Sequence, residues 1–252
     1  MRALLLAMAA GVPLMGCARE TVGPEVPVAV ALESLPFPAV VAGDSLRDTT
    51  GAVVPVRGQV FNYLGEELPD VPLGYLILDR GATIDATTGV VRGDSIRETP
   101  VRVVAFLEGL QTQAQQLFVV PAPDALAITA GNDTLEYSLV DTTVNVSDHL
   151  AVRLLSAGAT PVGIRGWIVS YQITHSASPA LAILLGDGST ESAIDTTAAD
   201  GGASRRLRVR PEELTATADS VVVLATARYR GAHVNGSPAR LVVHLRPRPP
   251  QP

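Results

Sequence analysis

The chain has 252 residues, of which 47% are hydrophobic and 17% charged, and its formal net charge is −6. This composition excludes a disordered chain, because it supplies enough apolar side chains to build a core. The acidic balance argues against a nucleic-acid-binding protein, since such proteins need clustered cations that face phosphates. Aromatic residues make up only 4%, so the core must consist mainly of aliphatic side chains.

The first seventeen residues have the parts of a secretory signal. Arg2 supplies a positive charge, an apolar stretch runs from Ala3 to Met15, and a small residue precedes Cys17. The stretch is about half as long as a membrane-spanning helix, so residues 1–16 are predicted to be a signal peptide. Its end, Leu14-Met15-Gly16-Cys17, resembles the lipobox of bacterial lipoproteins. The alternative is an ordinary signal peptide followed by a chance cysteine.

The lipobox resemblance implies an anchor and an address. In that family the signal is cut before the cysteine, whose sulfur and new amino group are then acylated, so Cys17 is the implied lipidation site. Ala18 is not aspartate, which implies sorting to the outer membrane of the bacterial cell envelope. Residues 17–25 would form a tether. Cys17 is also the only cysteine, so neither a disulfide within the chain nor a cysteine-based metal site is expected.

Beyond the signal, short Val-rich runs are separated by Gly, Pro, Asn and Asp, which is typical of an all-β sandwich. The first half contains five predicted strands: Val26–Leu32, Val53–Phe61, Leu73–Leu78, Val101–Leu107 and Gln115–Val120. Residues 121–124 hold two prolines, which a central strand does not accept, so they are predicted to be a linker. The second half contains seven predicted strands: Ala125–Thr129, His149–Leu155, Gly166–Thr174, Ala180–Leu185, Ala203–Val209, Ser220–Ala227 and Ala239–Leu245.

The two halves are related by an internal repeat. The matching blocks, in order, are Leu73–Ile77 with Gly166–Val169, Ala82–Gly89 with Ala193–Gly201, and Val103–Val120 with Val223–Val243. Three blocks in the same order indicate two copies of one module, residues 26–120 and 125–246. The remaining residues, 247–252, form a proline-rich tail and, together with the preceding Arg246, are predicted to be extended.

The repeated blocks resemble the bacterial immunoglobulin-like domains of intimin and invasin. The resemblance is carried by Ala82-Thr83-Ile84-Asp85 and Thr88-Gly89-Val90-Val91 in the first copy, and by Asp195–Ala203 in the second. It covers about residues 26–246 and implies two tandem immunoglobulin-like β sandwiches. The second copy departs from the pattern by extra sequence between Ala177 and Ser192, which leaves its strand count open.

Simple physical chemistry adds three expectations to this resemblance. Gly89 and Gly201 should supply the positive φ of tight turns, with Asp85 or Asp195 bonding the turn backbone. Trp167, the only tryptophan, should lie in a sandwich core, with Tyr75 at the matching position of the first copy. The alternation from Arg206 onward should place arginines on one solvated strand face, although the arginines at 205, 206, 208 and 210 could also form an anion-binding patch.

No sequence motif points to catalysis, so no cofactor and no catalytic residue is predicted. The four histidines, His149, His175, His233 and His244, are scattered singly. The Asp187–Ser189 and Asp195–Asp200 turns hold oxygen ligands, but they lack the spacing of an EF hand; turn chemistry is favoured, and calcium binding stays an open question.

The function expected from these features is that of a non-enzymatic, membrane-anchored envelope lipoprotein whose two domains serve as a spacer or an adhesion module. Partner binding, to an envelope protein or polysaccharide, would fall on loops at the sandwich ends. These loops are Asn62–Asp70, Gly186–Ser192 and Arg230–Ser237. The alternative is a carbohydrate-binding module or an accessory to an envelope enzyme on the same scaffold.

Overall fold

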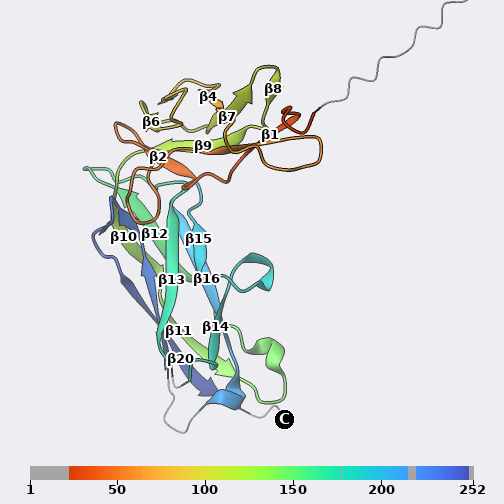
Figure 1. Cartoon of the computed structure of the whole chain (residues 1–252). Coiled ribbons are helices and arrows are strands. Elements are labelled where there is room, and N and C mark those ends of the chain that lie inside the picture. Colours follow the sequence, from red (N-terminus) through yellow and green to blue (C-terminus); the bar gives the residue numbers. More distant parts are fainter. Residues whose placement is uncertain (1–22, 177, 215–219, 250–252) are drawn as a thin grey trace, which may run out of the picture.

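The computed structural model describes residues 23–176, 178–214 and 220–249. Within them the chain forms twenty β-strands, three short 3₁₀ helices and no α-helix, so the predicted all-β fold class is confirmed. The strands make two modules joined in tandem. Those of the first module lie across one end of the second, and the chain leaves the second module at the opposite end (Figure 1).

The first module contains β1 to β9. Their bounds are β1 Ala29–Leu32, β2 Ala39–Val41, β3 Gly58–Phe61, β4 Gly74–Ile77, β5 Ala82–Ile84, β6 Val91–Gly93, β7 Val101–Leu107, β8 Leu110–Gln111 and β9 Gln115–Val120. One sheet has the order β2-β9-β7-β4, with β8 paired to β7, and β2 runs parallel to β9. The pairs β1-β3 and β5-β6 form the remaining sheets of this module.

The second module contains β10 to β20. Their bounds are β10 Pro123–Ala130, β11 Asn132–Tyr137, β12 Leu150–Ser156, β13 Ile168–His175, β14 Ala182–Leu185, β15 Ile194–Thr196, β16 Gly202–Val209, β17 Ser220–Thr226, β18 Arg228–Tyr229, β19 Ala232–His233 and β20 Ala239–Pro247. A four-stranded sheet β10-β12-β16-β14 faces a five-stranded sheet β11-β20-β17-β13-β15, and β18-β19 is a separate hairpin. The 3₁₀ helices are Thr142–Val144, Asp187–Ser189 and Pro211–Glu213.

The same pairing pattern recurs in both modules. In each, the first strand pairs antiparallel with the third (β1-β3 and β10-β12), whereas the second pairs parallel with the last (β2-β9 and β11-β20). This division of the opening segment between two sheets, with β7 or β17 in the centre, is immunoglobulin-like. β14 and the Asp187–Ser189 turn lie in the extra sequence of the second copy.

All of the predicted strands are present, and β7 and β9 have the predicted bounds. The predicted linker is shorter than expected, because Pro123 and Asp124 belong to β10 and only residues 121 and 122 separate it from β9. Pro123 is tolerated there because β10 is an edge strand. The predicted tail also begins later, since Pro247 pairs with Tyr137 and the Arg248 N–H donates to the Tyr137 carbonyl at 2.8 Å.

The expectation for the turn glycines is confirmed in both modules, and that for the turn aspartate is confirmed in the first module only. Gly89 and Gly201 have φ of 72° and 85°, a region that side chains with a Cβ avoid. The Asp85 carboxylate accepts from the Thr87 and Thr88 N–H groups. Asp195 instead accepts from the Thr196 and Ser204 N–H groups, which ties β15 to β16.

Candidate functional site

The predicted lipidation site, Cys17, and the cleavage motif Leu14–Gly16 lie outside the described residues. The last part of the predicted tether is held against the first module, because the Asn62 side-chain amide donates to the Pro24 carbonyl at 2.9 Å. None of the helices in the described residues is long and apolar enough to cross a membrane.

The first of the three expected binding loops is organised by its own opening residue. Asn62 is buried, with 3% of its surface exposed, and its side-chain oxygen accepts from the N–H groups of Leu64 and Glu66. Asn62 is therefore a turn-forming residue that a partner could not reach. Tyr63 and Leu64 beside it are exposed.

The third expected binding loop, Arg230–Ser237, contacts the first module at its tip. Arg230 and Gly231 join β18 to β19 and have φ of 52° and 80°. Two consecutive residues with positive φ between paired strands make a type I′ hairpin. Its tip reaches Asp44, which follows β2 in the first module. Arg230, at the tip of this expected binding loop, thus forms a bond within the protein, although its side chain is 57% exposed. We call the contact region between the two modules the junction.

Asp44 is the polar centre of the junction. Its carboxylate is 8% exposed and accepts from the Arg230 Nε at 2.8 Å and from the Tyr229 hydroxyl at 2.9 Å, both from the second module. Arg47 of the first module donates from Nε and Nη2 at 3.1 and 3.0 Å. The Ser45 N–H donates to the same carboxylate at 2.8 Å. Charge-assisted bonds with a forked arginine are among the strongest polar contacts in proteins.

The fold of the first module places Asp44 at this position. After β2 the Asp44 N–H donates to the Val41 carbonyl at 3.0 Å, and the Asp44 carbonyl accepts from the Gly93 N–H at 3.0 Å. These bonds fix the turn against β6, so the carboxylate is held in place before the second module contributes to it. Such preorganisation reduces the entropy lost in forming the ion pair.

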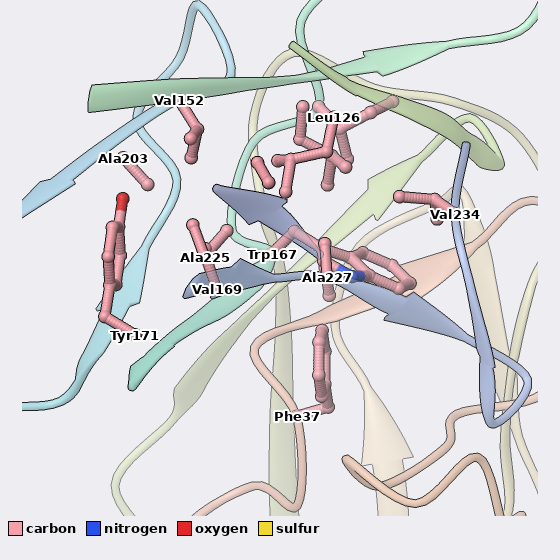
Figure 2. Close-up of a cluster of buried hydrophobic side chains, with 14 of the residues drawn as sticks. Phe37, Leu126, Val152, Trp167, Val169, Tyr171, Ala203, Ala225, Ala227 and Val234 are labelled. Atoms are coloured by element: carbon pink, nitrogen blue, oxygen red, sulfur yellow. The ribbon is translucent and has the colours of Figure 1, made fainter. Parts of the chain in front are cut away.

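Aromatic side chains form the apolar part of the junction. Trp167, 5% exposed, packs edge to face on Phe37 of the first module, with ring centroids 4.7 Å apart, and on Tyr229 at 6.0 Å. Its indole N–H donates to the Arg228 carbonyl at 3.1 Å. Figure 2 shows the indole between Phe37 on one side and Ala227 and Val234 of its own module on the other. The prediction that Trp167 is buried is confirmed, and its position joins two cores. Tyr75, at the matching position, is only partly buried.

Two further close contacts join the modules. Gly51 lies so close to the hairpin that a Cβ on it would sit 2.1 Å from the Gly231 nitrogen, which no side chain can tolerate. Arg165 donates from Nη1 to the Glu98 carbonyl at 2.7 Å, and its guanidinium lies 5.4 Å from the centre of the Phe118 ring. Buried hydrophobic residues of both modules belong to one continuous cluster. The junction is therefore packed like an interior.

The contacts of the junction shift the pKa values of several of its ionisable groups, most importantly those of Asp44 and Tyr229. Burial alone would raise the pKa of the Asp44 carboxyl, but the bonds from Arg47, Arg230, the Ser45 N–H and Tyr229 outweigh it and hold that pKa well below its usual range. Burial, together with the bond to Asp44, raises the pKa of the Tyr229 hydroxyl. Asp44 is consequently ionised, and Tyr229 neutral, throughout the physiological range.

The junction should weaken in acid. Because the pKa of Asp44 is depressed in the folded state, its contribution is present above the unfolded pKa of about 4 and is lost as the pH falls towards the folded value. The gap between the urea unfolding midpoints of the wild type and Asp44→Asn should therefore narrow as the pH falls from 7 to 3. The other carboxylates titrate in both proteins and cancel in the comparison. A constant gap between the two midpoints would contradict this role of Asp44.

The histidines and acidic side chains of the described residues do not gather into a metal centre. No three His, Cys, Asp or Glu side chains among them lie close enough together to hold a metal ion. His149 contacts the Ser204 hydroxyl, and His233 contacts Arg228 and Ser237. In the acidic turn, the Asp195 carboxylate forms an ion pair with Arg205 at 3.2 Å, so its oxygens serve the protein's own groups.

The sequence alone pointed to Trp167 but not to the partners of Asp44. Asp44 and Tyr229 lie 185 residues apart, and no local pattern links them. One signal was available in the repeat, because Glu108-Gly109 of the first module matches Arg230-Gly231 and also has a positive φ at its first residue. The Glu108-Gly109 hairpin of the first module is exposed. The matching hairpin of the second module has an arginine in place of the glutamate, and this difference between the copies was the signal in the sequence.

Comparison with known proteins identifies no family. No protein-family model matches the chain, and no curated protein matches it. Among solved structures, the adhesin InvE of Yersinia pseudotuberculosis is 14% identical with a TM-score of 0.37, and the match covers 86% of this chain and 58% of that one. Domains 5–6 of the surface-layer protein SbsC are 13% identical with a TM-score of 0.31, covering 88% and 98%. A β-glucuronidase of glycoside hydrolase family 2 is 13% identical with a TM-score of 0.32, covering 75% and 20%.

Proposed function

We propose that this protein is a non-catalytic lipoprotein of the bacterial cell envelope, anchored in the outer membrane by lipid on Cys17, whose two immunoglobulin-like modules act as a spacer that carries a binding surface. The observation that carries the spacer role is the junction. A two-residue linker, a shared apolar cluster and the Asp44 ion pairs hold the second module in one orientation relative to the first.

The physical consequence is a fixed separation between the two ends of the protein. Tandem domains joined only by a flexible linker reorient freely, whereas a packed apolar interface opposes such motion. The end of the described chain lies on the side of the second module remote from the first (Figure 1). An anchored first module would thus keep the second at a set distance from the membrane.

Support for the anchor comes from the lipobox sequence. Each buried methylene of an acyl chain contributes about 0.8 kcal/mol, and more than one chain is needed for stable attachment. Acylation at both the sulfur and the amino group of Cys17 would meet that requirement. Residues 18–23 then connect the lipid to the first described turn, so the first module would lie close to the bilayer.

The anchor is tested by metabolic labelling with radioactive palmitate in a bacterial host. Wild-type protein should incorporate label and sediment with membranes, whereas Cys17→Ser should incorporate none. Ala18→Ser, which alters the neighbouring residue but keeps the cysteine, is the matched control and should label normally. Equal labelling of the Cys17→Ser and wild-type proteins, or no labelling of either, would overturn the anchor.

A further inference from the structure

A row of arginines lies on the outward side of the four-stranded sheet of the second module. Arg153 lies on β12, and Arg206 and Arg208 lie on β16. Along β16 these two alternate with the buried Leu207 and Val209, so the predicted arginine-bearing strand face is confirmed. Arg205 differs from them, since it is buried and paired with Asp195. We call Arg153, Arg206 and Arg208 the arginine face.

The positive charge of the arginine face is not balanced by ion pairs. Strands β12, β14 and β16 contain no aspartate or glutamate, and none of the ion pairs among the described residues includes an arginine of this face. Arg153 and Arg206 donate only from Nε, to the carbonyls of Asp200 and Ser147. Because each of these two side chains uses only its Nε in a bond within the protein, its two Nη groups are available to an external acceptor.

The arginines are spaced as the sheet dictates. Arg206 and Arg208 are two residues apart on one strand, which separates them by about 7 Å. Arg153 pairs with Gly202 on the neighbouring strand, four residues before Arg206. The face therefore extends for about 20 Å along the sheet. A row of this length suits an extended ligand with repeated negative charges better than a single small anion.

A hollow with polar walls adjoins the arginine face. Its lining includes His149, Ser189, Ser204 and Arg206, and the His149 Nδ1 lies 3.1 Å from the Ser204 hydroxyl. Ser189 belongs to the Gly186–Ser192 loop, one of the three expected binding loops. Hydroxyl, imidazole and guanidinium groups around one recess can bond both the hydroxyls and the acidic group of a sugar.

We propose that the arginine face and its hollow bind an acidic polysaccharide. A membrane surface is the competing partner for a basic patch, but interfacial binding needs apolar side chains that enter the bilayer boundary. None of the large hydrophobic residues exposed in the described chain lies on β12, β14 or β16. The residues between the arginines are small or polar, such as Ala151, Gly202 and Ser204. This inference specifies the binding role proposed above and does not depend on the lipid at Cys17.

The test measures binding of the full chain, purified in detergent, to polygalacturonate, a polymer of carboxylated sugars. The triple variant Arg153→Gln, Arg206→Gln, Arg208→Gln removes the face. The matched control, Arg57→Gln, Arg92→Gln, Arg240→Gln, removes three exposed arginines elsewhere and so makes the same change in net charge. Circular dichroism and thermal melting confirm that both variants fold. Neutral dextran tests for charge dependence.

Wild type and the control variant should bind polygalacturonate with similar affinity, weakening as salt is added. The face variant should bind about tenfold more weakly, the sum expected for three solvent-accessible charge contacts, and dextran should not bind. Equal losses in both triple variants would show non-specific attraction and overturn the proposal. It would also be overturned if wild type bound vesicles containing phosphatidylglycerol but not the polysaccharide. Neither result would alter the palmitate labelling at Cys17.

Discussion

Replacing Trp167 with alanine should lower the free energy of unfolding by about 3–5 kcal/mol, the range measured for large aromatic side chains lost from cores. For a chain of this size the melting temperature should fall by roughly 10 °C. The change leaves a cavity between Phe37 and Tyr229, and it also leaves the Arg228 carbonyl without the indole donor. Because these partners belong to different modules, the loss should be felt by both.

Calorimetry or chemical unfolding measures the effect, with two comparisons to separate its causes. Trp167→Phe keeps most of the apolar volume but lacks the indole N–H, so it should lose less stability than the alanine variant. Tyr63→Ala removes an aromatic ring that is 54% exposed and should melt close to the wild type. A Trp167→Ala variant that melted like the wild type would show that the indole contributes nothing to the junction.

The sequence predicts the strands and turns that are marked by patterns of neighbouring residues. The long strands β7 and β9 appear as Val-rich runs between turn residues, and the turns at Gly89 and Gly201 are marked by Asp and Thr nearby. The strands that were not predicted are short or lack such a pattern. β2 has three buried residues in a row and β11 begins with Asn132-Asp133, so neither shows the alternation that identifies a half-buried strand.

The junction could be read from the sequence only in part, because its contacts join distant segments. β2 and β11 pair in parallel with β9 and β20, strands far along the chain, and such pairing leaves no turn signature between partners. Asp44 looks like an ordinary turn residue until β2 is in place. Pro121 and Pro123 suggested a stiff linker, but the sequence does not show that β10 begins at Pro123 and brings the second module into direct contact.

Replacing Asp44 with alanine should open the junction while both modules stay folded. Arg230 and Arg47 would lose their shared carboxylate, and the Tyr229 hydroxyl would lose its acceptor. The cost should be about 2 kcal/mol, less than for a fully buried pair, because both arginines are partly exposed and can hydrate. Since Trp167 is the only tryptophan and is buried at the junction, its fluorescence should shift to longer wavelength before the sheets unfold.

The matched control for Asp44→Ala is Asp79→Ala, which also breaks an aspartate–arginine pair in the first module. Asp79 bonds the Arg102 guanidinium at 3.0 Å, but that arginine is 55% exposed and both residues belong to the first module. Exposed ion pairs contribute little to stability. Asp79→Ala should therefore leave the wavelength of the tryptophan emission unchanged until the sheets unfold. Small-angle scattering should show a larger radius of gyration for Asp44→Ala alone. If both variants behaved alike, the two modules would be held together by apolar packing, and Asp44 would have no special part in fixing their orientation.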